Sequence, residues 1–167
     1  MIVSLAEALR KSVEARAAGR RVAVANGAFD LLHVGHLRYL EEAKALAADG
    51  AREGVLIVGV NTDASVRLGK GPGRPLVPQA ERAELVAALR CVDLVVLFDE
   101  PGAEALLTAL RPDLHVKGTD YSAESVPERA LVERLGGRTV IAGDPKDHST
   151  TDLLARLRDL ALRSNAK

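Results

Sequence analysis

The amino-acid sequence predicts an α/β protein in which one doubly wound, parallel, five-stranded sheet lies between two layers of helices (α/β/α), in a single domain. Five short apolar runs, rich in β-branched residues, are nearly unbroken, as expected for strands covered on both faces. Longer stretches with helical periodicity separate them, and this alternation indicates a parallel sheet. The 167 residues show no internal repeat and no linker to a second domain, and this length suits a single core.

The expected strands and helices alternate along the chain, and several helix starts are marked by proline or by capping residues. Pro78 and Pro101 each open a helical stretch, because proline is well tolerated in a first turn. Ser125 and Ser149 each stand three residues before an acidic residue, the pattern of a capping box, and a helix is expected after each. The glycine pair 136–137 ends the first of these two helices. The expected strands are residues 21–27, 54–60, 92–98, 113–118 and 138–143.

Residues 1–19 are expected to form a lead-in helix, packed on a core domain of residues 20–167. This first stretch is helix-periodic and interrupted by charges, unlike a secretory leader, and no run approaches the ~20 apolar residues that span a bilayer. Lys plus Arg (23) equal Asp plus Glu (23), and aromatic residues make up 2%, so the chain offers nucleic acid neither a basic field nor a base-stacking platform. The single cysteine, Cys91, excludes an internal disulfide. We expect a cytoplasmic protein that binds no nucleic acid and no membrane.

The stretch after the first expected strand carries the clearest functional signal. Asn26-Gly27-Ala28-Phe29-Asp30 leads through two leucines into His33-Val34-Gly35-His36, and a helix follows. A strand–turn–helix junction directs free backbone N–H groups and the positive end of the helix at one point, which suits an anion. Residues three apart on a helical turn face the same way, so His33 and His36 converge there, and Gly35 leaves room for a close ligand. The pattern predicts that the two histidines bind a phosphate.

Other interpretations of these patterns stay open. The two histidines could be core or capping residues, or metal ligands, although the metalloprotease pattern needs a four-residue spacing and an adjacent glutamate, which are absent. No Walker A motif occurs, and no Gly-x-Gly-x-x-Gly motif follows the first strand. In the glycine-rich stretch 68–75, Lys70 and Arg74 could close over phosphates, or the stretch could be a solvated loop.

Six blocks of the sequence resemble, in order and spacing, those of the nucleotidyltransferase superfamily marked by a His-x-Gly-His motif. Within it, the chain resembles most the bacterial D-glycero-β-D-manno-heptose 1-phosphate adenylyltransferases, which are free-standing proteins or C-terminal halves of bifunctional kinase–adenylyltransferases. The resemblance spans roughly residues 21–160 and implies a Rossmann-like fold. The blocks are NGAFDLLHVGH (26–36), VGVNTDASV (58–66), GRPLVPQAER (73–82), VDLVVLFDE (92–100), RPDLHVKGTDY (111–121) and STTDLL (149–154).

The resemblance implies transfer of AMP from ATP to D-glycero-β-D-manno-heptose 1-phosphate, which gives ADP-heptose, a precursor of bacterial surface glycans, and pyrophosphate. A phosphate oxygen of the sugar attacks the α-phosphorus of ATP in line, so the reaction needs positioning and charge neutralisation more than a covalent group on the protein. Mg²⁺ is expected with ATP, held by phosphates and water. Homodimers are common among relatives, and the resemblance leaves that state open.

The resemblance also implies roles for individual residues. The catalytic residues would be His33, His36, Lys70 and Lys117, which would neutralise charge on the phosphates. The nucleotide would be bound by Asn26, Gly27, Ala28, Phe29, Asp30, Gly35, Asp120, Tyr121, Ser149, Thr150 and Thr151. The sugar phosphate would be bound by Asn61, Asp63, Arg74, Arg82 and Gly118. No residue is assigned to a metal.

Structural roles remain as alternatives for four of these residues. Asp30 could orient a histidine or hold the turn after the first strand, since Asp is common at such junctions. Asp63 is equally suited to capping a helix, and Ser149 to capping the last one. Arg82 could be a surface arginine instead of a phosphate ligand.

Three other functions are compatible with the sequence. Two are sister reactions: a cytidylyltransferase acting on glycerol 3-phosphate, and an adenylyltransferase resembling archaeal FAD synthases. The block DPKDHSTT lacks the RTxGIS context of the former, and the blocks VKGTDY and STT favour the heptose class over the latter. The third is a regulatory module that binds a nucleotide without turnover. The intact histidines and Lys117 argue against this interpretation.

Overall fold

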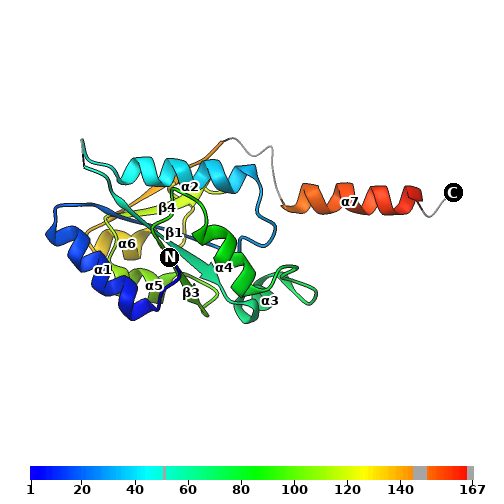
Figure 1. Ribbon diagram of the computed structural model, residues 1–167, viewed down its shortest axis with the longest axis horizontal. Helices are drawn as coiled ribbons and strands as arrows, with labels where there is room; N and C mark the ends of the chain where they lie inside the picture. The colour runs from blue at the N-terminus through cyan, green and yellow to red at the C-terminus, as the bar shows by residue number, and fades with distance from the viewer. Residues whose placement is uncertain (51, 145–149, 165–167) are drawn as a thin grey trace.

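A computed structural model describes residues 1–50, 52–144 and 150–164 of the chain (Figure 1). Five parallel strands form one sheet in the order β3-β2-β1-β4-β5, and every strand lies within two residues of its predicted bounds. The strands are β1 (Val22–Gly27), β2 (Val55–Asn61), β3 (Leu94–Phe98), β4 (Leu114–Gly118) and β5 (Arg138–Ala142). The helices are α1 (Leu5–Ala17), α2 (Val34–Ala47), α3 (Asp63–Lys70), α4 (Gln79–Ala87), α5 (Glu104–Leu110), α6 (Arg129–Arg134) and α7 (Thr150–Ser164).

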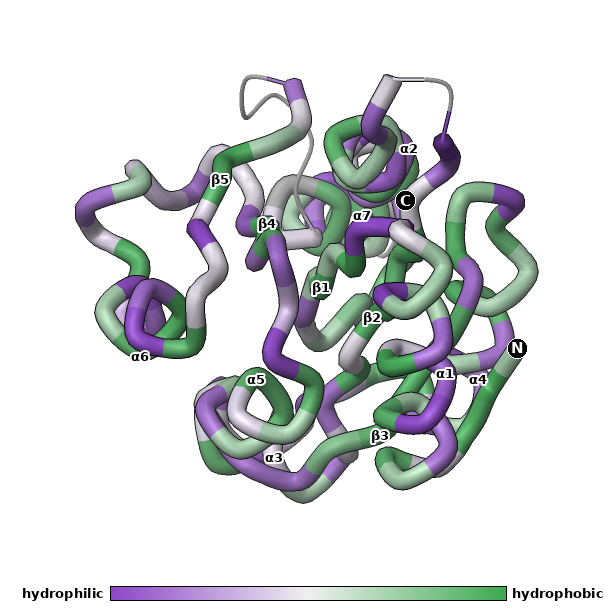
Figure 2. Tube along the Cα trace, turned by 90° about the vertical axis from the view of Figure 1, so that its left-hand side faces the viewer, coloured by the Kyte–Doolittle hydropathy of each residue, from purple (hydrophilic) through white to green (hydrophobic). Residues whose placement is uncertain are grey.

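Helices cover both faces of the sheet, because strand side chains alternate between two apolar clusters. On β1, Ala23 and Ala25 join the cluster that includes α2 and α4, whereas Val22 and Val24 join the cluster that includes α1, α5 and α6. In Figure 2, β1, β2 and β4 lie in the middle of the view, with α2 on one side of them and α5 on the other. The predicted doubly wound α/β/α architecture is therefore confirmed.

The first residues of the chain extend the sheet before α1 begins. Val3 donates its backbone N–H to the carbonyl of Val95 (2.9 Å), and Val95 donates to the carbonyl of Met1 (2.9 Å). The hydroxyl of Ser4 then caps α1 by accepting the N–H of Glu7 at 3.2 Å. α1 packs on the core through Ala8 and Ala15, and the edge of β3 is partly covered.

Several local signals gave the wrong helix boundary. Ser125 does not cap α6, since its hydroxyl accepts the N–H of Ser122 (2.9 Å) and donates to the Ser122 carbonyl (3.0 Å). Pro101 precedes the first residue of α5 by three positions, although Pro78 does stand at the start of α4. Thr62, not Asp63, caps α3 by accepting the N–H of Ser65 at 3.4 Å. The capping role predicted for Ser149 falls outside the described residues.

The sheet order places the carboxyl end of β1 at the centre of one edge. β1 pairs with β2 on one side and with β4 on the other. The connection that follows β1 runs toward β2, and the connection that follows β4 runs toward β5, so the two run in opposite directions across the sheet. Ligands of open parallel sheets bind at such a switch point, outside the carboxyl ends of the strands. α7 begins on this side and extends away from the body of the molecule (Figure 1). None of the helices in the described part of the chain combines the length and apolar character needed to cross a membrane.

Candidate active site

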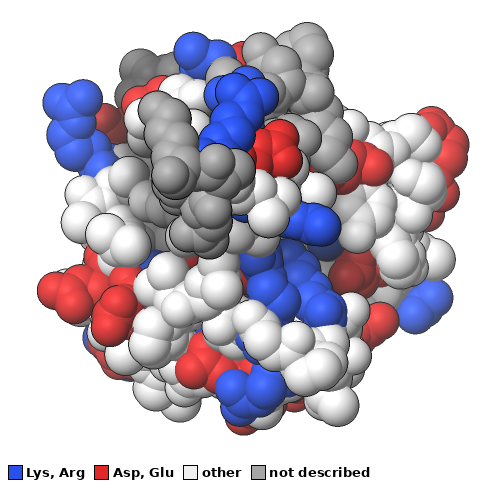
Figure 3. Space-filling view, turned by 90° about the vertical axis from the view of Figure 1, so that its right-hand side faces the viewer, with Lys and Arg blue, Asp and Glu red and all other residues white. Residues whose placement is uncertain are grey.

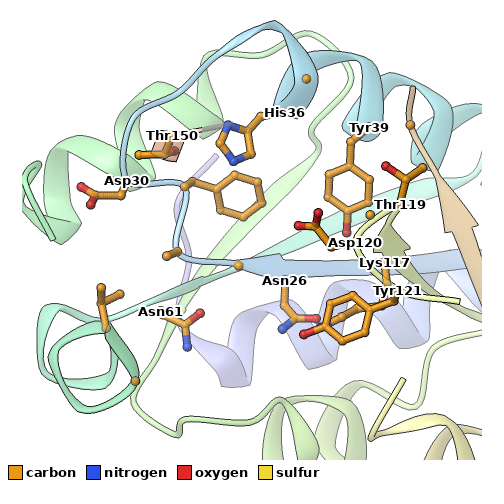
Figure 4. A pocket seen from close by; sticks show the side chains of 18 of the residues that line it. Asn26, Asp30, His36, Tyr39, Asn61, Lys117, Thr119, Asp120, Tyr121 and Thr150 are labelled. Carbon is orange, nitrogen blue, oxygen red and sulfur yellow. The ribbon is translucent and has the colours of Figure 1, made fainter. Parts of the chain in front are cut away.

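A cavity of about 620 Å³ lies at the carboxyl ends of β1, β2 and β4, within the size range of small-molecule sites. The start of α2, the end of α3 and the first residues of α7 complete its walls. Figure 4 shows His36 and Thr150 at one side of the cavity and Lys117 and Tyr121 at another. On the face that carries the cavity, Lys and Arg side chains gather in a central hollow (Figure 3). This face of the molecule therefore offers positive charge to an anionic ligand.

The structure brings together most of the residues that the sequence assigns to the site. The cavity is lined by Asn26, Gly27, Ala28, Phe29, Asp30, His33, Gly35, His36, Asn61, Lys70, Lys117, Gly118, Asp120, Tyr121, Thr150 and Thr151. Asp63, Arg74 and Arg82 do not line it. Ser149 lies outside the described residues.

The histidine pair sits at the first turn of α2. His33 is the residue before the helix, and its ring centroid lies 3.9 Å from that of His36. The Nδ1 atom of His36 accepts the backbone N–H of His33 at 3.3 Å, so neutral His36 carries its proton on Nε2. The ring of Phe29 packs against His36 with the centroids 5.3 Å apart. These contacts fix the His36 ring beside the positive end of the helix.

His36 is neutral in this arrangement. Burial lowers its pKa to about 4, and the positive charges of His33 and Lys70 act in the same direction, while Asp120 opposes them. A polyanion bound beside His36 would favour its protonated form and so oppose this shift of its pKa.

The segment that precedes α4 holds the turn between β1 and α2. Asp30 accepts the N–H groups of Leu76 (2.7 Å) and Val77 (3.0 Å). Its carboxylate also forms an ion pair with Arg74 at 2.9 Å. Phe29 adopts a φ of 49°, a left-handed conformation that is uncommon for a residue with a side chain. Of the two local roles considered for Asp30, the structure thus gives it that of holding the turn.

Arg82 supports the same turn from inside the protein and is neither exposed nor in the cavity. Its side chain is 0% exposed. Its guanidinium donates to the carbonyl oxygens of Val77 (2.8 Å) and Ala28, and to the carboxylate of Asp63 at 2.8 Å. A buried guanidinium is tolerated because each side of its fork has an acceptor. Arg82, Arg74 and Asp63 thus make contacts within the protein, and the substrate contacts expected of them stay predictions.

Lys117 lies at the end of β4, on the opposite wall from the histidines. The residue is 8% exposed, and its Nζ lies 4.9 Å from the centroid of the Tyr121 ring. Burial lowers the pKa of Lys117, and the carboxylates of Glu128 and Glu104 oppose this shift. The cation–π contact holds the ammonium at the cavity wall without neutralising it. Lys117 is thus available to an anionic ligand.

Two asparagines at the ends of β1 and β2 are held by hydrogen bonds within the protein. The Nε2 atom of His115 lies 3.0 Å from Oδ1 of Asn26. Burial lowers the pKa of His115 to about 3, and the nearby Lys117 adds to the shift, so neutral His115 can donate to Asn26. Asn61 donates through Nδ2 to the hydroxyl of Ser65 (2.9 Å) and to the carbonyl of Glu100 (3.2 Å). The asparagine amides are therefore oriented before a ligand binds.

Several lining residues are not predicted by the sequence. They include Tyr39, Ser65, Glu104, Thr119, Glu128, Gly143 and Asp144. Tyr39 follows His36 by three residues on α2, and that spacing could have indicated it. Its hydroxyl donates to the carbonyl of Val116 at 2.6 Å, which ties α2 to β4. Glu128 carries no such signal, because it follows an irregular loop.

Known proteins resemble this chain along nearly its whole length. The family model for cytidylyltransferase-like proteins matches residues 24–156. The D-beta-D-heptose 1-phosphate adenylyltransferase of Bordetella bronchiseptica is 48% identical over 158 residues, which cover 94% of this chain and 93% of that protein. The bifunctional protein HldE of Syntrophotalea carbinolica is 45% identical over 158 residues, 94% of this chain and 31% of that protein, so this chain spans about a third of the bifunctional relative.

A solved structure shows the same fold. The crystal structure of the lipopolysaccharide core biosynthesis protein from Thermoplasma volcanium GSS1 superposes with a TM-score of 0.64 at 26% sequence identity. The match covers 77% of this chain and 100% of that one. The shared part is therefore the complete fold of the smaller protein.

Proposed function

This chain belongs to the cytidylyltransferase-like family, and we propose that it transfers AMP from ATP to D-glycero-β-D-manno-heptose 1-phosphate, giving ADP-heptose and pyrophosphate. One observation carries the proposal: the paired rings of His33 and His36 stand at the start of α2 and line a cavity with Lys117 on its far wall. That arrangement suits a triphosphate and a second phosphate together. The choice of acceptor is supported by the name of the free-standing relative, which matches this chain over 94% of its length.

The proposed reaction is an in-line displacement at the α-phosphorus of ATP. An oxygen of the sugar phosphate forms the new P–O bond while the bond to pyrophosphate breaks, so no covalent intermediate with the protein is required. His36, which is neutral and donates through Nε2, and the N–H groups at the start of α2 would stabilise charge on the phosphates. Lys70 and Lys117 would do so from other sides of the cavity. The protein thus contributes orientation and charge neutralisation.

Magnesium would accompany the nucleotide. Across the residues that the structure describes, no group of three or more His, Cys, Asp or Glu side chains is placed to hold a metal ion. Mg²⁺ keeps several waters and is commonly bound through substrate phosphates and one or two carboxylates. Asp120 is one of several carboxylates that line the cavity, and its charge acts on His36, so it would be placed to contribute such a ligand. The ion would supply additional neutralisation of the triphosphate.

Pyrophosphate release tests the proposal. The protein, with Mg²⁺, is given ATP or CTP in combination with D-glycero-β-D-manno-heptose 1-phosphate, glycerol 3-phosphate or flavin mononucleotide. We expect release only with ATP and the heptose phosphate. Release with a different pair would assign the protein to a sister reaction on the same fold. Nucleotide binding without release from any pair would contradict the proposed activity and favour a regulatory module.

A further inference from the structure

One carboxylate in the cavity has no place in the phosphate chemistry. Glu128 lines the cavity and is 5% exposed. Among the described residues, its Oε2 atom has no hydrogen-bond partner. A buried acceptor without a donor is costly, so an oxygen of this kind facing a cavity indicates a ligand that brings the donor.

The fold holds Glu128 in one place. Its backbone carbonyl accepts the N–H of Val132 at 3.0 Å, which anchors it at the start of α6. Val126, two residues before it, and Val132 are both buried. Pro127 lines the cavity beside it. The backbone of Glu128 is therefore anchored at the cavity wall, and its side chain is buried there.

Glu128 is also not explained as the ion-pair partner of Lys117. Within the described part of the chain, no ion pair joins these two residues, and the Lys117 ammonium lies over the Tyr121 ring at 4.9 Å. The two charges still act on each other, as the effect of Glu128 on the pKa of Lys117 shows. The Glu128 carboxylate, a hydrogen-bond acceptor, and the Lys117 ammonium, a hydrogen-bond donor, are therefore separated by a gap.

The side of this gap that Glu128 forms disfavours a phosphate and suits hydroxyl groups. An ionised carboxylate accepts hydrogen bonds only, and it repels a phosphate oxygen. Glu104, which also lines the cavity and acts on Lys117, adds to this negative character. Both substrates of the proposed reaction carry uncharged hydroxyl groups next to a phosphate: the ribose of ATP and the ring of the sugar phosphate.

Resting on the proposed function, we propose that Glu128 accepts hydrogen bonds from the hydroxyl groups of a bound sugar and so selects the sugar of one substrate. The ribose of the nucleotide and the ring of the acceptor share this chemistry. Binding measurements that need no turnover separate them, and the same measurements remain informative if the proposed reaction fails.

The nucleotide part of the experiment compares ATP, 2′-deoxy-ATP and 3′-deoxy-ATP by calorimetry with Mg²⁺. The proteins are the wild type, Glu128→Ala, the isosteric Glu128→Gln, and Glu124→Gln as a control. Glu124 is an exposed carboxylate in the same loop and does not line the cavity. If the ribose is the ligand, the wild type prefers ATP to at least one deoxynucleotide by about 10- to 100-fold, the loss expected for a hydrogen bond to a charged group. Glu128→Ala then abolishes the preference.

The acceptor part compares D-glycero-β-D-manno-heptose 1-phosphate with inorganic phosphate, which carries no sugar hydroxyl. If the acceptor sugar is the ligand, Glu128→Ala weakens the sugar phosphate by at least about 10-fold and leaves inorganic phosphate unchanged. Glu128→Gln keeps one acceptor oxygen without the charge, so it should lose less affinity than Glu128→Ala, whichever sugar is the ligand. This variant reports on the site if the alanine variant does not fold.

Two results would overturn the inference. One is that Glu128→Ala weakens ligands with and without the hydroxyl groups equally, which would mean that Glu128 acts only through the charge of Lys117. The other is that neither ligand pair responds to the Glu128 variants. If the wild type releases no pyrophosphate, only the proposed reaction is contradicted, because the binding comparison does not depend on turnover.

Discussion

Replacing Arg82 with methionine tests whether this arginine supports the site from within the protein or binds the substrate. Methionine keeps much of the length of the side chain and removes the guanidinium, leaving the carbonyls of Ala28 and Val77 and the carboxylate of Asp63 without their donor. Removing one partner of a buried ion pair costs about 3–5 kcal/mol. The Asp63 side chain is 27% exposed, so water can replace part of the lost contact. We therefore expect the free energy of unfolding to fall by about 3 kcal/mol, near the lower end of this range.

Urea unfolding, followed by circular dichroism, measures this loss. The matched control is Arg90→Met, since Arg90 is exposed shortly after α4, and its unfolding free energy should change by less than about 0.5 kcal/mol. Arg82→Lys should recover only part of the stability, because an ammonium cannot reproduce the guanidinium fork. An Arg82→Met protein with unchanged stability and weakened phosphate binding would refute the reasoning and support direct contact with the substrate.

Three further predictions concern stability and protonation. The pKa of His115 is lowered from 6.5 to about 3, so the unfolded chain binds a proton below pH 6.5 that the folded chain does not. The free energy of unfolding should therefore fall as the pH drops from 7 to 5. In urea titrations, His115→Leu should reduce that fall by about 2 kcal/mol. An unchanged fall would contradict the assignment. Binding of ATP at pH 6 should be accompanied by proton uptake, seen by calorimetry in buffers of different ionisation enthalpy; His36→Ala should lose it, and equal uptake by the variant would place the proton elsewhere. Tyr39→Phe should lower the free energy of unfolding by about 1–2 kcal/mol, since it removes the buried hydrogen bond to the Val116 carbonyl, and an unchanged urea midpoint would argue against that hydrogen bond.

The fold could be predicted from the sequence because its main determinants are local. Parallel strands such as β2 are buried on both faces, so their sequences are continuous apolar runs that stand out from the amphipathic helices. The junction of β1 with α2 was equally legible, since the glycine and the two histidines lie within one short segment. Helix boundaries were harder to predict, because a residue such as Ser125 has the side chain of a helix cap but forms its hydrogen bond with Ser122 instead.

Residues whose roles depend on distant partners could not be predicted. The sequence does not reveal that Arg82 is buried against Ala28, which lies in the turn between β1 and α2. Likewise, the link between His115 on β4 and Asn26 on β1 exists only because these two strands are neighbours in the sheet. Glu128 enters the cavity through an irregular loop with no periodic pattern. Such contacts follow from the tertiary structure, and spacing along the chain carries no signal for them.

The most direct test of the account compares pyrophosphate release by the wild type and by His36→Ala, given ATP, Mg²⁺ and D-glycero-β-D-manno-heptose 1-phosphate. We predict that release by the wild type requires both substrates, and that the folded variant is slower by at least about 100-fold, because it loses a donor that stabilises charge on the reacting phosphates. A His36→Ala protein that remains folded and releases pyrophosphate at a near-normal rate would contradict the role of the histidine pair.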